Sequence, residues 1–243
     1  EQELINLGLD SGPLNDTVPT AAIDTLQDLQ INSKNILDYT GIEDFTALRI
    51  LNCETNPNAT YIDLSNNLLL EKLYCQSNYF SALDLSNNSL LWYLKCQNNQ
   101  VLNSLNITNN VALKEFDCSV NSLDSLDLGY KPVLNYFKAE NNQLTSLDAS
   151  GCTNLKFLLV KNNNLSSLNF QNGNNTLISQ SYKFNTLNNP NLLCIQVDDA
   201  TYSTSNWTHI DATSSFSANC SLAGCTDPIA CNYDPLAWID DGS

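Results

Sequence analysis

The chain lacks methionine, has a single histidine, His209, and carries only 10 basic residues against 26 acidic ones, for a formal net charge of -16. So few basic side chains argue against a nucleic-acid partner, because phosphate binding needs a basic face. No run of about 18 apolar residues occurs, so the sequence predicts no membrane-spanning helix. A zinc site is not indicated either, because no cysteines have CxxC spacing and only His209 could supply an imidazole.

Groups that carry out catalysis are also missing from the sequence. With one histidine, no glycine-rich phosphate loop and no convergent pair of acids, there is no set of residues to assign to a reaction. A glycosidase that uses only carboxylates would need two acids placed across a cleft, and a regular repeat does not predict such a cleft. We therefore expect a protein that is not an enzyme.

The cysteine content points to an exported protein. Nine cysteines without any methionine are unusual for a cytosolic chain. The sequence begins at Glu1 without a signal peptide, as a mature or trimmed chain does. We expect a location that is secreted or at the outer cell surface.

An internal repeat dominates the sequence. Its units follow the pattern LxxLxCxxNxLxxLDLSxNxx, with steps of 21 or 22 residues except for a last step of 15. One unit cannot bury its own apolar side, so the units must stack, and the alternating LxxLxC segment indicates one short parallel strand per coil. The LDLS half alternates too, which favours a second extended edge over a helix. The opening leucines are Leu26, Leu48, Leu70, Leu91, Leu113, Leu134, Leu155, Leu177 and Leu192.

Coils in register bring equivalent residues into columns. One column of asparagines is expected to bond the backbone of neighbouring turns. A column of cysteines is expected to point inward as free thiols, which we favour over disulfides or a metal because parallel Cβ vectors suit a bridge poorly. The asparagines are Asn56, Asn78, Asn99, Asn121, Asn142, Asn163 and Asn185, and the thiol column is Cys53, Cys75, Cys96 and Cys118, continued by Ala139, Val160 and Tyr182.

The pattern from Leu26 to Leu192 resembles that of leucine-rich-repeat proteins, which are generally curved solenoids that bind ligands. The segments ELINLGLD, TGIEDFTAL and CIQVDDATYSTSNWTHIDATSSFSANC more narrowly resemble secreted leucine-rich-repeat proteins of the Bacteroidetes bacteria. The segment GCTDPIACNYDPLAWIDDGS resembles a short module of exported proteins in that group, which commonly ends in DGSC ahead of a sorting domain for type IX secretion. The resemblance implies export and leaves the ligand open.

The expected fold is a leucine-rich-repeat solenoid, a right-handed parallel β superhelix of about nine coils with little helix and a cap at each end. We assign residues 1–25 to the N-terminal cap, 26–198 to the repeats, 199–223 to the C-terminal cap and 224–243 to a truncated Cys/Asp-rich module. A short helix is expected at residues 1–9.

The cysteines near the C-terminus are expected to pair differently from the thiol column. We place Leu192, Ile195 and Val197 at inward strand positions, so Cys194 is free to form a disulfide with Cys220. Cys225 and Cys231 pair either with each other or with a cysteine beyond Ser243, and the sequence leaves both alternatives open.

Residues that flank the inward strand positions are expected to form a concave binding surface. Five of the ten basic residues, Lys72, Lys95, Lys138, Lys161 and Lys183, fall on it among aromatic side chains. Aromatics beside lysines suit a glycan or an acidic protein segment. The alternative is a self-satisfied sheet surface, since Lys95, Asp117 and Lys138 share a cross-strand column and can neutralise one another. The candidate ligand-binding residues are Lys72, Tyr74, Tyr93, Lys95, Tyr136, Lys138, Phe157 and Lys161.

Two acidic groups are candidate calcium sites, because carboxylate and amide oxygens suit this ion. The first is the stripe of Asp63, Asp84, Asp127 and Asp148, for which a solvated surface is the favoured interpretation. The second lies in the terminal module, which lacks the EF-hand order and its terminal glutamate, so that an acidic linker remains the alternative. Its residues are Asp227, Asn232, Asp234, Asp240 and Asp241.

The leading functional hypothesis is a non-catalytic domain that binds a protein or a polysaccharide at the cell surface through the concave strand face. The alternative is a structural spacer or adhesin segment that displays other domains or associates with itself. Apart from calcium, no cofactor is expected.

Overall fold

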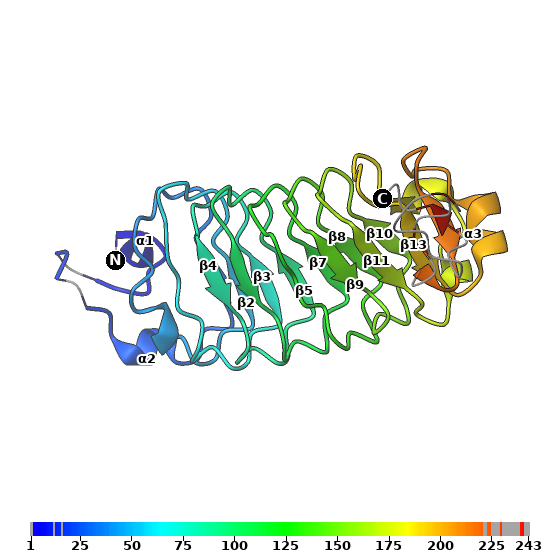
Figure 1. Ribbon diagram of the computed structural model, residues 1–243. Coiled ribbons are helices and arrows are strands. Elements are labelled where there is room, and N and C mark those ends of the chain that lie inside the picture. Colours follow the sequence, from blue (N-terminus) through cyan, green and yellow to red (C-terminus); the bar gives the residue numbers. More distant parts are fainter. Residues whose placement is uncertain are drawn as a thin grey trace.

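The computed structural model is an elongated parallel β-solenoid, with the N-terminal cap at one end of the stack and the C-terminal cap at the other (Figure 1). The structure describes residues 2–11, 13–15, 17–220, 223–224, 229 and 239–240, without the side chains of 223–224 and 239–240. Within these ranges, no helix is long and apolar enough to cross a membrane.

Eight parallel strands, one from each successive coil, form what we call the long sheet. Its register follows the repeat, so that Leu73 pairs with Leu51 on one side and Leu94 on the other. These leucines are fully buried while their strand neighbours are partly exposed, because successive strand side chains point to opposite faces. The strands are β1 (Asp28–Gln30), β2 (Ile50–Asn52), β3 (Lys72–Tyr74), β5 (Tyr93–Lys95), β7 (Glu115–Asp117), β8 (Tyr136–Lys138), β10 (Phe157–Leu159) and β12 (Phe184–Asn185).

The LDLS half of the repeat forms the second extended edge that the sequence predicts. It consists of a two-stranded sheet, β4-β6, and a four-stranded sheet in the order β14-β13-β11-β9. Between β6 and β9 the pairing is interrupted, because residues 124–129 form no strand. The bounds are β4 (Ala82–Asp84), β6 (Ser104–Asn106), β9 (Ser146–Asp148), β11 (Ser167–Phe170), β13 (Cys194–Val197) and β14 (Ser215–Ser217).

Helices are short and lie mainly towards the two ends of the solenoid. The N-terminal cap contains α1, shorter than the helix expected at residues 1–9, and α2. The C-terminal cap contains α3, whose first turn is capped by Asp199 accepting a bond from the Tyr202 amide at 2.9 Å. The bounds are α1 (Gln2–Asn6), α2 (Thr20–Ile23), η1 (Ile42–Asp44), η2 (Asn175–Leu177), η3 (Ser181–Lys183) and α3 (Ala200–Asn206), and two further strands, β15 (Ala223–Gly224) and β16 (Ile239–Asp240), pair with each other.

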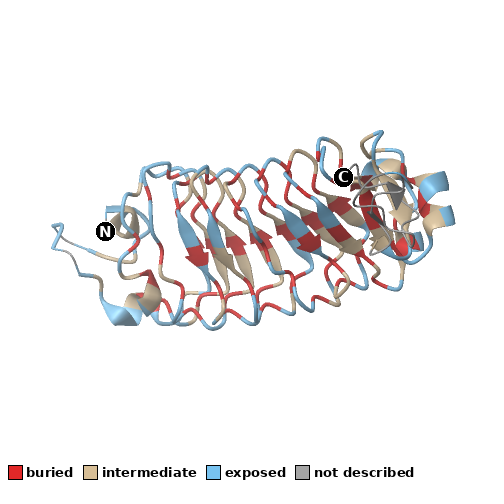
Figure 2. Cartoon of the chain, in the orientation of Figure 1, coloured by how far each residue is buried: buried red, intermediate tan, exposed pale blue. Residues whose placement is uncertain are grey.

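One hydrophobic core runs along the solenoid, and Figure 2 shows buried residues alternating with more exposed ones along the strands. The thiol column lies inside it: Cys53, Cys75, Cys96 and Cys118 are fully buried and free, as predicted. Burial raises the pKa of Cys53 to about 12, so the thiols stay protonated at neutral pH and pack as small apolar groups.

The asparagine column bonds neighbouring coils to each other, as the sequence predicts. Asn99 Nδ2 donates to the carbonyls of Cys75 and Cys96, both at 3.0 Å, and its Oδ1 accepts from the Phe80 amide at 3.2 Å. Each such side chain therefore satisfies backbone groups that are buried at the bend between strands.

A second asparagine column, which the sequence analysis did not single out, lies at the opposite bend, three residues before the opening leucines. Asn88 Nδ2 donates to the carbonyls of Leu64 and Asn67 at 3.0 and 2.9 Å. The next members after Asn110 are Lys131 and Cys152, and Lys131 is fully buried with no hydrogen-bond partner for Nζ among the described residues. The column is Asn67, Asn88, Asn110, Lys131 and Cys152.

The predicted register of the last coil is wrong. Leu158 pairs with Phe184, so Phe184 takes the inward strand position and the asparagine column continues at Asn189, which donates to the carbonyls of Val160 and Thr186, rather than at Asn185. Thr186 replaces Tyr182 in the thiol column, since Val160 and Thr186 hold equivalent positions. This coil is longer than the others and contains η2 and η3, which shifts the spacing.

The predicted place of the segment around Ile195 is also wrong. Ile195 pairs with Leu168, so Leu192, Ile195 and Val197 belong to the second edge and not to the long sheet. The disulfide between Cys194 and Cys220 is present as predicted and ties β13 to the cap.

Val120 occupies a strained backbone position. It has a φ of 57° and is an apolar residue in a column otherwise filled by the polar residues serine, threonine and asparagine, and a bulky β-branched side chain is disfavoured at such a φ. We expect Val120→Asn to raise the free energy of unfolding by about 1 kcal/mol, measured by urea denaturation. Val111→Asn is the matched control, since Val111 is also exposed but has no positive φ. If the two substitutions changed the free energy of unfolding equally, backbone strain at Val120 would not be the cause.

Candidate binding face

The outward side of the long sheet, here called the binding face, brings the predicted ligand-binding residues together. Lys72 lies beside Tyr93, and Tyr74 lies beside Lys95 in the next coil. Tyr136 lies beside Phe157, with Lys138 beside Leu159. The flanking strand residues are partly exposed where the central ones are buried, so the alternation places these side chains on one side.

Aromatic rings form two clusters on the binding face. The ring centroids of Tyr74 and Tyr93 are 4.9 Å apart, and those of Tyr136 and Phe157 are 5.4 Å apart. Strand β7 lies between the two clusters and carries the carboxylates Glu115 and Asp117. The face thus presents two aromatic platforms with a carboxylate pair between them.

Lysine side chains lie over these rings. Lys72 Nζ is 4.6 Å from the ring centre of Trp92, and Lys95 Nζ is 5.4 Å from that of Tyr93. Lys183 Nζ lies 4.9 Å from the ring centre of Phe157. Trp92 was missed by the sequence analysis, although the run LWYLK places it next to Tyr93 and its ring is 5.8 Å from that of Tyr93.

The charged groups of the face partly neutralise each other. Lys138 and Lys161 both reach the Glu140 carboxylate, at 3.1 and 3.8 Å. Lys95, Asp117 and Lys138 share a column as predicted, and a hydrogen bond with Tyr93, together with the charge of Asp117, raises the pKa of Lys95. A ligand-binding surface and a self-satisfied sheet surface, the two alternatives raised by the sequence, therefore both have a physical basis. The face pairs some charges internally and leaves others accessible.

The face is far more basic than the rest of the chain. The structure adds three basic residues to the predicted set: Arg49, Lys114 and Lys156. Each directly precedes a strand of the long sheet, in a column that also contains Trp92. With them, eight of the ten basic residues lie on or beside the face, and Lys34 and Lys131 are the other two. The eight are Arg49, Lys72, Lys95, Lys114, Lys138, Lys156, Lys161 and Lys183.

The acidic stripe on the second edge has a structural role. Asp63 accepts a bond from the Ser65 amide at 2.9 Å, and Asp84 accepts one from the Ser86 amide at 3.0 Å; these bonds lower the pKa of both carboxyls. Asp127 and Asp148 make the equivalent bonds to the amides two residues on. Each side chain closes a local turn, and the part of the chain described holds no group of three or more metal-ligating residues.

The second candidate calcium group, in the terminal module, lies almost entirely outside the described residues. Asp227, Asn232, Asp234 and Asp241 lie outside the described residues, as do Cys225 and Cys231. For Asp240 the structure describes only the backbone, which forms part of β16.

This stack of parallel strands, with two residue columns holding the coils together, is a leucine-rich-repeat solenoid, as the sequence predicts. The functional domain of InlJ from Listeria monocytogenes, which includes a cysteine ladder, resembles it with a TM-score of 0.62 and 26% sequence identity, over 81% of this chain and 46% of that one. This chain therefore spans less than half the length of that InlJ structure. This chain has a column of buried cysteines of its own, Cys53, Cys75, Cys96 and Cys118.

An internalin, InlF, of Listeria monocytogenes strain 4b F2365 is also similar, at 18% identity and a TM-score of 0.26, over 88% of this chain and 93% of that one. No protein-family model and no curated protein matches the sequence.

Proposed function

We propose that this chain is a non-catalytic binding domain of an exported or cell-surface protein, and that it recognises a protein or polysaccharide partner through the binding face. The observation that carries the proposal is the gathering of eight of ten basic residues, together with two aromatic clusters, on one side of a chain with a net charge of -16. Tyrosine and tryptophan side chains often carry much of the binding energy at protein interfaces, and the basic side chains give the face a charge that attracts an acidic partner.

Two further observations support this assignment. Solenoids commonly bind through the extended surface that their stacked strands provide, and the likeness to the InlJ functional domain agrees with a domain of the protein-binding or adhesin type. The Cys194–Cys220 disulfide supports a location outside the cytosol, since such bonds persist in oxidising compartments. We also propose type IX secretion as the export route, on the resemblance of residues 224–243 alone.

The partner is expected to be polar and to carry negative charge. Lys156 is exposed with no ion pair among the described residues, and Lys161 reaches Glu140 only at 3.8 Å. Lys161 shares the Glu140 carboxylate with Lys138, and Lys183 lies over the Phe157 ring, so basic side chains outnumber carboxylates around Phe157. An acidic polysaccharide or an acidic protein segment stacked on the rings fits this arrangement.

Replacing Tyr93, Tyr136 and Phe157 together by alanine tests the proposal. We expect binding to glycan arrays and to surface partners of the native protein to weaken at least tenfold, since each lost ring contributes contact area in a central position. The matched control is the triple Tyr61→Ala, Tyr79→Ala, Tyr130→Ala, because these tyrosines are exposed away from the strands of the long sheet. If the variant without Tyr93, Tyr136 and Phe157 bound its partners as well as the natural protein does, the binding face would be excluded as the recognition site.

A structural spacer or self-associating segment remains the second candidate, because one bend of the solenoid carries a row of exposed aliphatic side chains. Such a row is unusual for a surface that faces only water. Sedimentation velocity distinguishes the two functions, since a monomer that persists at high concentration contradicts self-association. The row is Leu68, Leu69, Leu90, Val111 and Val133.

A further inference from the structure

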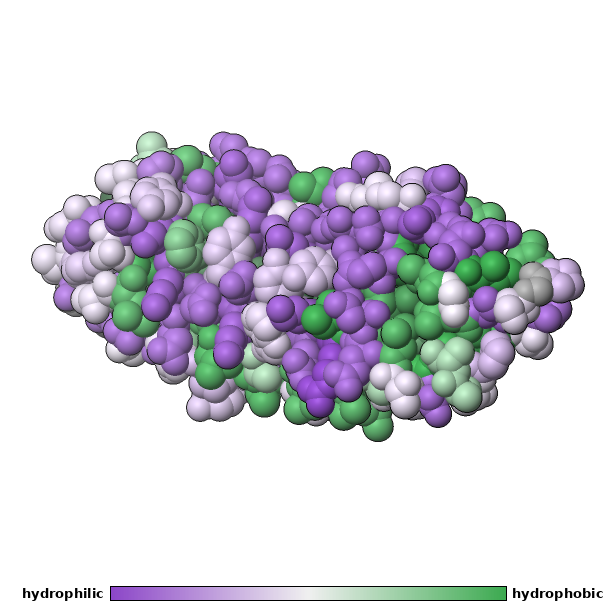
Figure 3. All heavy atoms as spheres, turned by 180° about the vertical axis from the view of Figure 1, so that it is seen from behind, coloured by the Kyte–Doolittle hydropathy of each residue, from purple (hydrophilic) through white to green (hydrophobic). Residues whose placement is uncertain are grey.

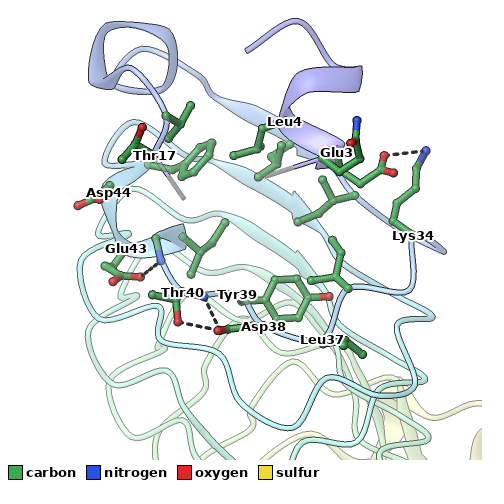
Figure 4. Close-up of a pocket in the computed structure, with 18 of the residues that line it drawn as sticks. Glu3, Leu4, Thr17, Lys34, Leu37, Asp38, Tyr39, Thr40, Glu43 and Asp44 are labelled. Atoms are coloured by element: carbon green, nitrogen blue, oxygen red, sulfur yellow. Dashed lines mark hydrogen bonds and ion pairs between the residues drawn. The ribbon is translucent and has the colours of Figure 1, made fainter. Parts of the chain in front are cut away.

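The N-terminal end of the solenoid is only partly filled by its cap. A cavity of about 940 Å³ lies between α1, residues 17–18 and the first coil. Figure 4 shows Leu4 of α1 on one side and Tyr39 of the first coil on the other. Helix α1 contains no buried residue, although Leu4 packs against the core. Figure 3 shows hydrophobic side chains gathered at this end of the molecule.

The floor of the cavity is apolar and belongs to the core. Leu29, Ile31, Ile42 and Phe45 line it, and each is a core residue of the first coil that is at most 4% exposed. In later coils the equivalent side chains are covered by the next coil on both sides, as Leu73 is by Leu51 and Leu94. The cavity thus occupies the place where a preceding coil would pack.

An open strand edge borders the same cavity. Among the described strands, β1 pairs only with β2. The Ile31 amide donates to the Asn52 carbonyl at 2.8 Å, and the Gln27 carbonyl accepts from the Ile50 amide at 2.9 Å. These odd-numbered residues therefore direct their backbone groups towards β2. In a strand the alternate residues, Asp28 and Gln30, turn their amide and carbonyl groups the other way, towards the cap. These groups are a template for one more strand.

The rim of the cavity is acidic. Glu3, Asp38, Glu43 and Asp44 supply four carboxylates, and Lys34 supplies the one amine among the described residues that line the cavity; Glu3 already pairs with it at 3.1 Å. Asp38 accepts bonds from the Thr40 amide and hydroxyl, and Glu43 accepts one from the Gly41 amide, so both carboxylates are held at the rim. A cationic ligand is favoured electrostatically at such a rim.

We propose that the cavity and the β1 edge together form a docking site for an extended segment of a partner protein in which apolar residues alternate with basic ones. Its backbone adds a strand to β1, its apolar side chains enter the cavity against Leu4, Ile36 and Leu37, which line it and are partly or largely exposed, and its basic side chains meet the acidic rim. This site is separate from the binding face and does not depend on it.

Two synthetic heptapeptides test the proposal with the whole chain, one alternating valine with lysine and one alternating valine with glutamate. We expect saturable binding of the lysine peptide by fluorescence anisotropy, none of the glutamate peptide, and slower amide exchange at Asp28 and Gln30 when the lysine peptide is bound. Because strand addition needs the peptide backbone, N-methylation of alternate residues is expected to abolish binding.

Charge-neutral variants separate a specific site from general attraction to an acidic chain. The triple Asp38→Asn, Glu43→Gln, Asp44→Asn keeps the local acceptor atoms and is expected to weaken binding about tenfold. The matched triple Asp63→Asn, Asp84→Asn, Asp148→Asn removes the same charge from the second edge and is expected to change binding less than twofold. Equal losses in the two triples, protection of amides elsewhere, or no binding of the lysine peptide would each overturn the proposal.

Discussion

Replacing Asn99 by alanine is expected to lower the free energy of unfolding by about 4 kcal/mol, measured by urea denaturation followed by circular dichroism. The amide of Asn99 bonds two carbonyls in adjacent coils, Cys75 and Cys96, and accepts from the Phe80 amide. Asn99 is fully buried, so water cannot replace these bonds without a rearrangement. Alanine removes all three bonds and leaves the Phe80 amide unpaired in the core, while the two carbonyls each keep one bond, from Asn78 and Asn121.

Asn103→Ala is the control for this prediction. Asn103 lies in the same coil with an exposed side chain, and the same change there is expected to alter stability by less than about 0.5 kcal/mol. If Asn99→Ala were no more damaging than Asn103→Ala, the asparagine column would not be what holds the coils in register.

Replacing Lys131 by methionine is expected to raise the free energy of unfolding by about 2 kcal/mol at neutral pH. Lys131 stands in the second asparagine column, but its ammonium has none of the bonds that Asn88 makes there. Methionine has a similar length and flexibility without the charge, so it fills the same space. Thermal denaturation of the variant and the natural protein measures the difference.

The stabilisation by Lys131→Met should depend on pH in a defined direction. Burial lowers the pKa of Lys131 in the folded state below its ordinary value of 10.5. Between the two pKa values the unfolded chain binds more protons, so the stability of the natural protein rises with pH across that window. The advantage of methionine is therefore greatest below the folded pKa and shrinks as the pH approaches 10.5.

Lys156→Met provides the comparison, because Lys156 is an exposed lysine. We expect it to change stability little at any pH. A gain for Lys131→Met that stays constant from pH 7 to pH 10.5 would show that packing alone, and not the buried charge, causes the effect.

Most of the repeat could be predicted because the regular spacing of its residues fixes which side chains meet in neighbouring coils. Steps of 21 or 22 residues bring Cys75, Cys96 and Cys118 to one place in consecutive coils, and each coil packs mainly against its two neighbours. The regular spacing ends after Leu158, since 26 residues separate the paired positions Leu158 and Phe184. The asparagine-rich run NTLNN offers several candidates for the column there, and only the pairing selects Asn189.

Parts of the binding face could not be predicted from the spacing. The alternation of strand residues indicates that Tyr93 and Lys95 face outward. It does not indicate that Lys72 reaches Trp92, or that Lys161 reaches Glu140, because these contacts depend on side-chain reach between coils. The sequence thus identifies the face, while its internal charge pairing comes from the packed structure.

By itself, the sequence determined the coil, its inward leucines and the free thiols, because a repeated pattern has one way to bury its apolar side. It also indicated the Cys194–Cys220 bridge, although it placed the segment around Cys194 in the wrong sheet. The tertiary structure alone decided the register of the last coil, the burial of Lys131 and the cavity beneath α1. These three depend on how irregular segments pack against a regular stack, and no periodicity in the sequence encodes that packing.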